Sequence, residues 1–274
     1  MRLAIEVEDL HFYYVKGEYV LRGINFEIKE GESVVIMGSN GAGKTTLIKH
    51  FNGLLKPIKG HVRVFGKDTR NHTVAELSRL VGIVFQNPDH QLFAETVEKE
   101  IRFALENFNF PSNEIDKRVD KILRYFGLER YKSASPFNLS EGEKKRLAIA
   151  SVLVYEPDIV VLDEPTIGQD AIQRKRIINV LKELIKSGKT VVAVTHDVEF
   201  AVELFERAIV LSRGLLVADG SVKEVLTNQK VLEVANLLPS QVTKCAWLLE
   251  DFGIPRDIVS IEELKEHIYK VLRG

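Results

Sequence analysis

The sequence has one cysteine, two methionines and one tryptophan in 274 residues, and its formal net charge at pH 7 is -1. With Cys245 alone, a disulfide framework within the chain is excluded, and a reducing compartment is favoured. The near-zero charge gives no general attraction to phosphate backbones, so no nucleic-acid partner is expected. No apolar run reaches the ~20 residues that span a bilayer, and the N-terminus has no apolar signal region. We therefore expect a cytosolic chain that reaches a membrane only through a partner.

Hydrophobic residues make up 45% of the chain and charged residues 28%, as in soluble globular proteins. Short apolar segments alternate with segments of helical periodicity. Strands are expected at Leu3–Glu8, Ile24–Ile28, Ser33–Met37, His61–Phe65, Val81–Phe85, Ile159–Asp163, Thr190–Thr195 and Arg207–Ser212. Helices are expected from Lys44 to about Leu54, in pieces between Thr96 and about Tyr155, and at Ala171–Lys186 and Val198–Phe205. This alternation predicts an α/β fold with a parallel sheet covered on both faces.

A change of pattern divides the chain near residue 220. Leu215–Asp219, between Gly214 and Gly220, resembles a hairpin strand, and no strand pattern follows it. Helical periodicity returns at Ser240–Phe252 and Ser260–Leu272. We expect a main domain over residues 1–220, with a helical subdomain at about 87–157, and a small helical C-terminal domain over 221–274.

A glycine-rich segment, Gly38-Ser39-Asn40-Gly41-Ala42-Gly43-Lys44-Thr45-Thr46, lies between a buried strand and a helix and fits the P-loop pattern. Its glycines, Gly41 and Gly43 among them, let backbone N–H groups turn toward phosphate oxygens. Lys44 supplies a charge to the β- and γ-phosphates, and the Thr45 hydroxyl is suited to Mg²⁺. A turn that binds nothing would not require Lys-Thr after the last glycine. The segment predicts that Asn40, Gly41, Gly43, Lys44, Thr45 and Thr46 bind a nucleotide with Mg²⁺.

Two acids follow the buried strand Ile159–Leu162. Asp163 is expected to hold Mg²⁺ beside Thr45. Side chains alternate along a strand, so Glu164 points elsewhere and is placed to orient or deprotonate the attacking water. The alternative is a pair of acids at a helix N-terminus, which is the weaker interpretation beside a P-loop.

The segment Leu139-Ser140-Glu141-Gly142-Glu143 resembles the signature motif of ABC ATPases, usually Leu-Ser-Gly-Gly-Gln. Gln86 after Val81–Phe85, Pro165-Thr166 after the acids, and Thr195-His196-Asp197 after a later strand stand in the order of that family. The resemblance covers about residues 1–220. It implies a P-loop NTPase domain of the ABC type, and two such domains that close head-to-tail around two ATP molecules.

The resemblance also implies roles for single residues. Gln86 would contact Mg²⁺ and the attacking water while sensing the transporter, and His196 would contact the γ-phosphate. Ser140 and Gly142 would reach the ATP of the opposing subunit, and Asp170 would lie in the loop that links the two sites. Each has an ordinary alternative: a loop residue for Gln86, and helix capping for Ser140 and His196.

Tyr14 ends Leu10-His11-Phe12-Tyr13-Tyr14, a segment that resembles the stretch where this family stacks an aromatic ring on adenine. Tyr13 and Tyr14 could instead be surface strand residues. Glu141 departs from the signature glycine and Glu143 from its glutamine. Because an anion at Glu141 would repel the partner's phosphate, we hypothesise that the chain pairs with a different ATPase and that the two sites are unequal.

Val84–Phe93, with Asn87-Pro88-Asp89-His90-Gln91 after Gln86, resembles energy-coupling-factor importers, including the cobalt and nickel types. That resemblance implies a second ABC ATPase subunit, identical or different, a transmembrane coupling protein, a substrate-binding membrane protein, and a location on the cytoplasmic face of the cell membrane. It also implies that the C-terminal helices contact the other ATPase, and that the cargo is a vitamin or a transition-metal ion. The alternatives are a soluble ABC ATPase acting on nucleic acid or ribosomes, and a nucleotide-binding regulator without turnover. One cysteine and no sustained heptads argue against the soluble class, and the intact Lys44, Asp163, Glu164 and His196 argue against the regulator.

Overall fold

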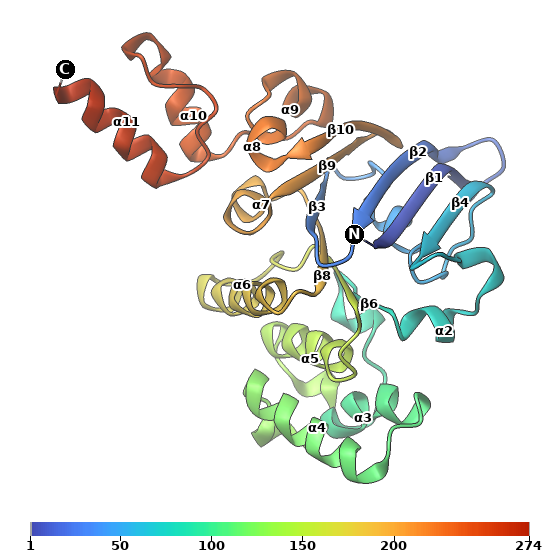
Figure 1. Cartoon of the computed structure of the whole chain (residues 1–274). Coiled ribbons are helices and arrows are strands. Elements are labelled where there is room, and N and C mark those ends of the chain that lie inside the picture. The colour runs from blue at the N-terminus through green and yellow to red at the C-terminus, as the bar shows by residue number, and fades with distance from the viewer. Residues whose placement is uncertain (1, 274) are drawn as a thin grey trace.

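A computed structural model describes residues 2–273, and Figure 1 shows its two sheets, the helices around them and a C-terminal helical projection. Met1 and Gly274, the outer ends of the two expected domains, lie outside the described residues. The strands are β1 Leu3–Tyr13, β2 Tyr19–Lys29, β3 Ser33–Met37, β4 Lys59–Val64, β5 Lys67–Asp68, β6 Val81–Val84, β7 Ile159–Asp163, β8 Thr190–Thr195, β9 Arg207–Ser212 and β10 Leu215–Ser221. Every strand of the sequence prediction is present.

The larger sheet has the strand order β10-β9-β3-β8-β7-β6. All neighbours in it are parallel except β9 and β10, which form the expected hairpin. Alternate residues of its strands enter two different cores: Val35 and Met37 face one, and Val34 and Ile36 face the other. This two-sided burial explains why β3, β7 and β8 each contain four consecutive apolar residues.

The second sheet, β2-β1-β4-β5, is antiparallel and was not predicted as a separate sheet. Its apolar face, with Ile5, Leu10 and Ile28, belongs to the same core as one face of the parallel sheet. The prediction of a parallel sheet is therefore correct for the larger sheet only, because the N-terminal strands pair with one another.

The helices are α1 Lys44–Ile48, α2 Val74–Ser78, α3 Val97–Asn107, α4 Ser112–Phe126, α5 Glu141–Leu153, α6 Ala171–Lys186, α7 Val198–Leu204, α8 Val222–Leu226, α9 Gln229–Ala235, α10 Gln241–Leu248 and α11 Ile261–Arg273. The helices α3, α4 and α5 lie together within residues 87–157, beside the parallel sheet (Figure 1).

The expected helix from Lys44 to about Leu54 is wrong in length, since α1 ends at Ile48. The next turns are tighter: the His50 N–H donates to the Leu47 carbonyl at 3.0 Å and the Phe51 N–H to the Ile48 carbonyl at 3.0 Å. The His50 ring also contacts the backbone of α1, because its Nδ1 lies within hydrogen-bonding distance, 2.8 Å, of the Thr46 carbonyl oxygen. These contacts replace the regular helical pattern.

The C-terminal boundary also differs from the expected residue 220. Helices α8 and α9 bury Val222, Leu226 and Leu232 in the core of the main domain. A separate small core, Ala246, Ile254, Ile258 and Leu264, joins only α10 and α11. In Figure 1 these two helices project from the rest of the fold. The projecting unit therefore begins near Gln241, because the apolar faces of α8 and α9 cover the sheet.

Among residues 2–273, no helix is long and apolar enough to cross a membrane. Cys245 is exposed on α10.

Candidate active site

The loop after β3 is shaped by glycines where no larger residue fits. Gly38 has φ +146°, and a Cβ there would lie 2.2 Å from the Leu211 carbonyl oxygen. Gly43 has φ +102° and caps α1, and a Cβ there would lie 2.8 Å from Leu21. Both positions combine a left-handed backbone with close packing, so only glycine is tolerated. The predicted P-loop thus follows its strand and precedes its helix.

Lys44, the first residue of α1, is buried, and its ammonium donates to the carbonyl oxygens of Gly38 at 2.7 Å and Ser39 at 3.1 Å. Its Nζ lies 3.9 Å from Glu164 Oε1. Burial lowers the pKa of Lys44, and the carboxylates of Glu164 and Asp163 partly offset this effect. The lysine charge therefore lies at the loop and faces both acids.

Asp163 ends β7 and is only 2% exposed. Its Oδ2 accepts a hydrogen bond of 2.7 Å from the Thr45 hydroxyl, whereas its Oδ1 is buried without a partner among the described residues. Burial raises the pKa of Asp163, and the negative charge of Glu164 adds to the rise. A buried carboxylate oxygen without a donor needs a cation or a donor group.

Glu164 has φ +44°, which is rare for a residue other than glycine. Its N–H donates to the Val194 carbonyl at 2.8 Å, and its Oε2 accepts from the Thr195 hydroxyl at 2.9 Å. His196 Nδ1 lies 2.9 Å from its Oε1. Glu164 is therefore held by contacts with β8 and does not cap a helix, and such strain concentrates at functional sites.

These groups border one cavity with a volume of about 250 Å³. It is lined by Val20, residues 40–46, Gln86, Asp163 and Glu164. Gln86 reaches it from the exposed loop after β6. Tyr14 lies beside it, with its hydroxyl 3.2 Å from Thr46 Oγ1 and a largely exposed ring. The fold thus brings together the predicted phosphate, metal and water groups.

The signature residues lie outside this cavity. Ser140 is exposed and is the N-cap of α5, in a reciprocal capping box with Glu143. Asp170 is the N-cap of α6 and accepts from the Gln173 N–H at 2.8 Å. Gly142 packs on α6, where a Cβ would lie 3.2 Å from Gln173. In the single chain, Ser140 therefore acts as a helix cap. Helix α7 is capped by Asp197 and not by His196.

Two residues near the site were missed in the sequence. Val20 lines the cavity from β2. Lys145 is only 2% exposed, and its ammonium donates to the carbonyl oxygens of Phe85 and Gln86 at 3.1 Å each. The sequence carries no clear signal for Lys145, which lies in the charged run Glu141–Arg146 at the start of α5. Lys145 ties α5 to the loop that carries Gln86.

Fold and site together define a P-loop ATPase of the ABC class. The family model for the ABC transporter matches residues 21–167. An energy-coupling factor transporter ATP-binding protein, EcfA of Methanocaldococcus jannaschii, is 41% identical over 260 residues, which are 94% of this chain and 92% of that protein. The chain therefore belongs to the ABC transporter family and, within it, to the ATP-binding proteins of the energy-coupling factor type.

Solved structures agree with this assignment. CbiO1 from Clostridium perfringens, described as part of the ABC transporter complex CbiONQ, is 37% identical with a TM-score of 0.75, over 91% of this chain and all of that one. A dimeric ATP-binding cassette in a post-hydrolysis state with ADP and Pi is 32% identical with a TM-score of 0.72, over 80% of this chain and 98% of that one. The chain is an ATPase of this fold.

Proposed function

We propose that this chain powers an energy-coupling factor importer, hydrolysing ATP to drive uptake of a vitamin or a transition-metal ion through membrane subunits. The observation that carries the proposal is the single cavity in which Lys44, the Thr45–Asp163 pair and Glu164 converge. A phosphate-binding loop, a metal carboxylate and a second carboxylate are the groups that phosphoryl transfer to water requires.

The P-loop would hold the ATP phosphates through its backbone N–H groups and Lys44. Asn40, Gly41, Gly43 and Thr46 line the cavity and are suited to the same contacts. The exposed Tyr14 ring, tethered near Thr46, would stack on adenine.

Mg²⁺ would be held by Thr45 and Asp163, with Gln86 as a further oxygen ligand. The partnerless Asp163 Oδ1 fits this role, because a buried carboxylate oxygen beside a hydroxyl is the donor set that Mg²⁺ prefers. Within residues 2–273 no cluster of three His, Cys, Asp or Glu side chains could hold a metal by itself. A site completed by phosphate and water oxygens is therefore expected. When bound, the ion neutralises charge on the phosphates.

Glu164 would accept the proton of the attacking water. Thr195 and His196 fix its carboxylate from two sides, and this orientation supports a general-base role. His196 is about half exposed beside it, where it would contact the γ-phosphate.

A second ATPase subunit, identical or different, would complete the site. Ser140 and Asp170 are exposed at the starts of α5 and α6, where they are available to an opposing nucleotide and to the loop that links the sites. Gly142 shares that surface. On the projecting C-terminal unit, Ile261 and Leu272 are exposed apolar residues that support a role of α10 and α11 in dimerisation.

A transmembrane coupling protein would dock in the groove beside the Gln86 loop. This groove has a volume of 1140 Å³ and a mostly apolar lining that includes Phe93 and Phe103, whose rings meet edge-to-face at 4.7 Å. Glu100 anchors the loop by accepting from the N–H groups of Phe93 at 2.9 Å and Ala94 at 2.8 Å. The loop that carries Gln86 therefore contributes residues both to this groove and to the P-loop cavity. With a substrate-binding membrane protein in the same complex, the chain would work at the cytoplasmic face of the cell membrane.

Glu164→Gln tests the chemistry. The amide keeps the shape of the side chain but cannot take the proton, so we expect a fall in kcat of ~10²–10⁴-fold with ATP binding retained. Steady-state hydrolysis and nucleotide titration measure the two effects. Glu30→Gln, an exposed change in the turn before β3, is the control. Normal turnover of Glu164→Gln would contradict the base assignment.

Purification of the tagged chain from its own host in mild detergent, followed by mass spectrometry, tests the transport proposal. Recovery of small multi-span proteins with an ATPase partner supports it, and the substrate-binding subunit would indicate the cargo. Recovery of ribosomal or DNA-associated proteins without membrane partners would overturn it and leave the ATPase chemistry intact.

A further inference from the structure

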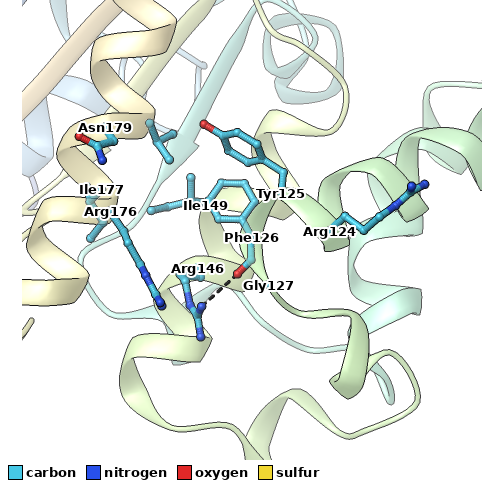
Figure 2. Close-up of a pocket in the computed structure, with 10 residues that line it drawn as sticks. Arg124, Tyr125, Phe126, Gly127, Arg146, Ile149, Arg176, Ile177 and Asn179 are labelled. Atoms are coloured by element: carbon cyan, nitrogen blue, oxygen red, sulfur yellow. Dashed lines mark hydrogen bonds between the residues drawn. The ribbon is translucent and has the colours of Figure 1, made fainter.

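A second cavity, of 300 Å³, lies between the C-terminal end of α4, the middle of α5 and the middle of α6 (Figure 2). It shares no lining residue with the P-loop cavity. Its volume is at the lower end of the ~300–1,000 Å³ typical of small-molecule sites. The role proposed above for the chain makes no use of this cavity.

Of the three arginines that line the cavity, Arg146 and Arg176 give one side of it a net positive charge. In Figure 2 the guanidinium groups of Arg146 and Arg176 approach each other at one side of the cavity. No aspartate or glutamate lines it, and Arg176 forms no ion pair with any residue between 2 and 273. Burial and the nearby charge of Arg176 both lower the pKa of Arg146. An anion between the two groups would relieve this repulsion.

Arg146 is held in place but keeps an unused donor. Its side chain is 12% exposed, and its Nη1 donates to the Phe126 carbonyl at 3.0 Å, as the dashed line in Figure 2 marks. Its Nε is buried without a partner. The nearest carboxylate, Glu143, is 3.9 Å away and already accepts from Ser140 and Tyr131. This Nε is too enclosed for a ligand to reach, but the Nη2 of the same fixed guanidinium donates no hydrogen bond within residues 2–273 and is available to an acceptor that the chain does not supply.

The rest of the cavity is apolar. Phe126, Ile149, Ile177 and Val180, all buried, contribute to its lining. In Figure 2 the Phe126 ring and Ile149 lie beside the arginines. A ligand that fits both halves has an anionic head and a small apolar body.

We propose that this cavity binds a small phosphate monoester, with the phosphate between Arg146 and Arg176 and the organic group against Phe126 and Ile149. A phosphate carries ~1.5–2 negative charges at pH 7, which matches two facing guanidinium groups better than one carboxylate does. Planar guanidinium forks suit its oxygens.

The location gives such a ligand access to the ATPase machinery. Arg146 lies six residues after Ser140, the N-cap of α5, and Arg176 six residues after Asp170, the N-cap of α6. The two helices also touch where Gly142 meets Gln173. A bound phosphate monoester would therefore cross-link the signature helix to the helix after the linking loop, about two turns from both motifs.

Calorimetric titration of the full chain with phenyl phosphate tests this inference, in the presence of saturating Mg²⁺ and ADP to fill the P-loop. We expect saturable binding at one site, weaker binding of inorganic phosphate, and none of phenol. Arg176→Gln should weaken phenyl phosphate at least about tenfold, as expected when a charge-assisted hydrogen bond is lost. Arg176 is exposed on α6, so this variant should keep the fold, which circular dichroism checks.

Lys175→Gln is the matched control, because it removes one positive charge from the neighbouring exposed residue of α6 that does not line the cavity. The affinity of Lys175→Gln for phenyl phosphate should equal that of the unmodified chain. The proposal would be overturned by any of three results: no saturable binding, an equal loss of affinity in Lys175→Gln and Arg176→Gln, or a binding signal that appears only without ADP. Equal affinity for inorganic phosphate would overturn the assignment of an organic ligand.

Discussion

Replacing Glu143 with glutamine restores the residue usual in the signature motif of the family and removes one negative charge from the first turn of α5. The Glu143 carboxylate accepts hydrogen bonds from the Tyr131 hydroxyl and from the hydroxyl and N–H of Ser140, and it lies near the Arg146 charge. These contacts, with that of Tyr131 first, lower the pKa of Glu143 from its ordinary 4.5 to about 2. The folded state therefore favours the charged form.

The size of the effect follows from this pKa. A fall from 4.5 to about 2 corresponds to at most about 3.4 kcal/mol of stabilisation at neutral pH. The Glu143 side chain is 14% exposed at a helix end, and solvent screening reduces the contribution to ~1–2 kcal/mol. At ~2–4 °C per kcal/mol for a chain of this size, Glu143→Gln should lower Tm by about 2–8 °C.

Thermal unfolding of the nucleotide-free chain, followed by circular dichroism at a series of pH values, measures this difference. Because the folded-state pKa is the lower one, the stabilisation is complete above pH 4.5 and is lost as the pH falls toward about 2. The difference in Tm between the variant and the unmodified chain should close over that range. Glu141→Gln, in the same turn but 70% exposed, is the control and should change stability by less than ~0.5 kcal/mol.

A Glu143→Gln variant as stable as the unmodified chain at pH 7 would refute this reasoning. So would a difference in Tm that persists unchanged at acid pH, because the effect would then come from packing and not from charge.

Three further changes test other parts of the structure. Lys145→Met should lower kcat about tenfold or more, because the Gln86 loop loses both lysine hydrogen bonds; it should leave Tm nearly unchanged, because burial already lowers the pKa of Lys145 to about 8 and disfavours its charge. Unchanged hydrolysis would contradict the positioning role. Burial lowers the pKa of His50 from 6.5 to about 4, so between these pH values the unfolded chain binds a proton that the folded chain does not, and stability falls as the pH falls. His50→Gln should make the free energy of unfolding less dependent on pH in this range. Denaturant unfolding at a series of pH values measures this, and an unaltered pH profile would exclude His50 as the cause. Glu141→Gly should raise ATP turnover at the opposing site, and equal turnover would exclude repulsion by Glu141.

The residues that meet at the candidate site could be named from the sequence because their motifs are local. Asp163 and Glu164 end a strand whose apolar run is legible in the sequence, and the glycines around Lys44 mark the loop directly. The sheet arrangement was less accessible, because an alternating pattern such as that of β1 shows which face is buried but not which strand lies beside it.

Two features of the structure depend on long-range contacts that the sequence does not reveal. The apolar residues of α8 and α9, Leu232 among them, predict helices correctly, but nothing in their spacing tells which sheet they cover. Lys145 reads as a surface residue of a charged helix start, and only the position of the Gln86 loop reveals that its ammonium is enclosed. Both required the tertiary structure.

The position of β3 has a consequence for biosynthesis. The strand that leads into the P-loop is made early, yet its neighbours on both sides, β8 and β9, begin at Thr190 and Arg207. Until those strands emerge from the ribosome, a mostly apolar strand has two open edges and the nucleotide site has no rigid base. ATP therefore cannot assist folding of the nascent chain until most of it has been synthesised, and a chain that stops before β8 is expected to aggregate.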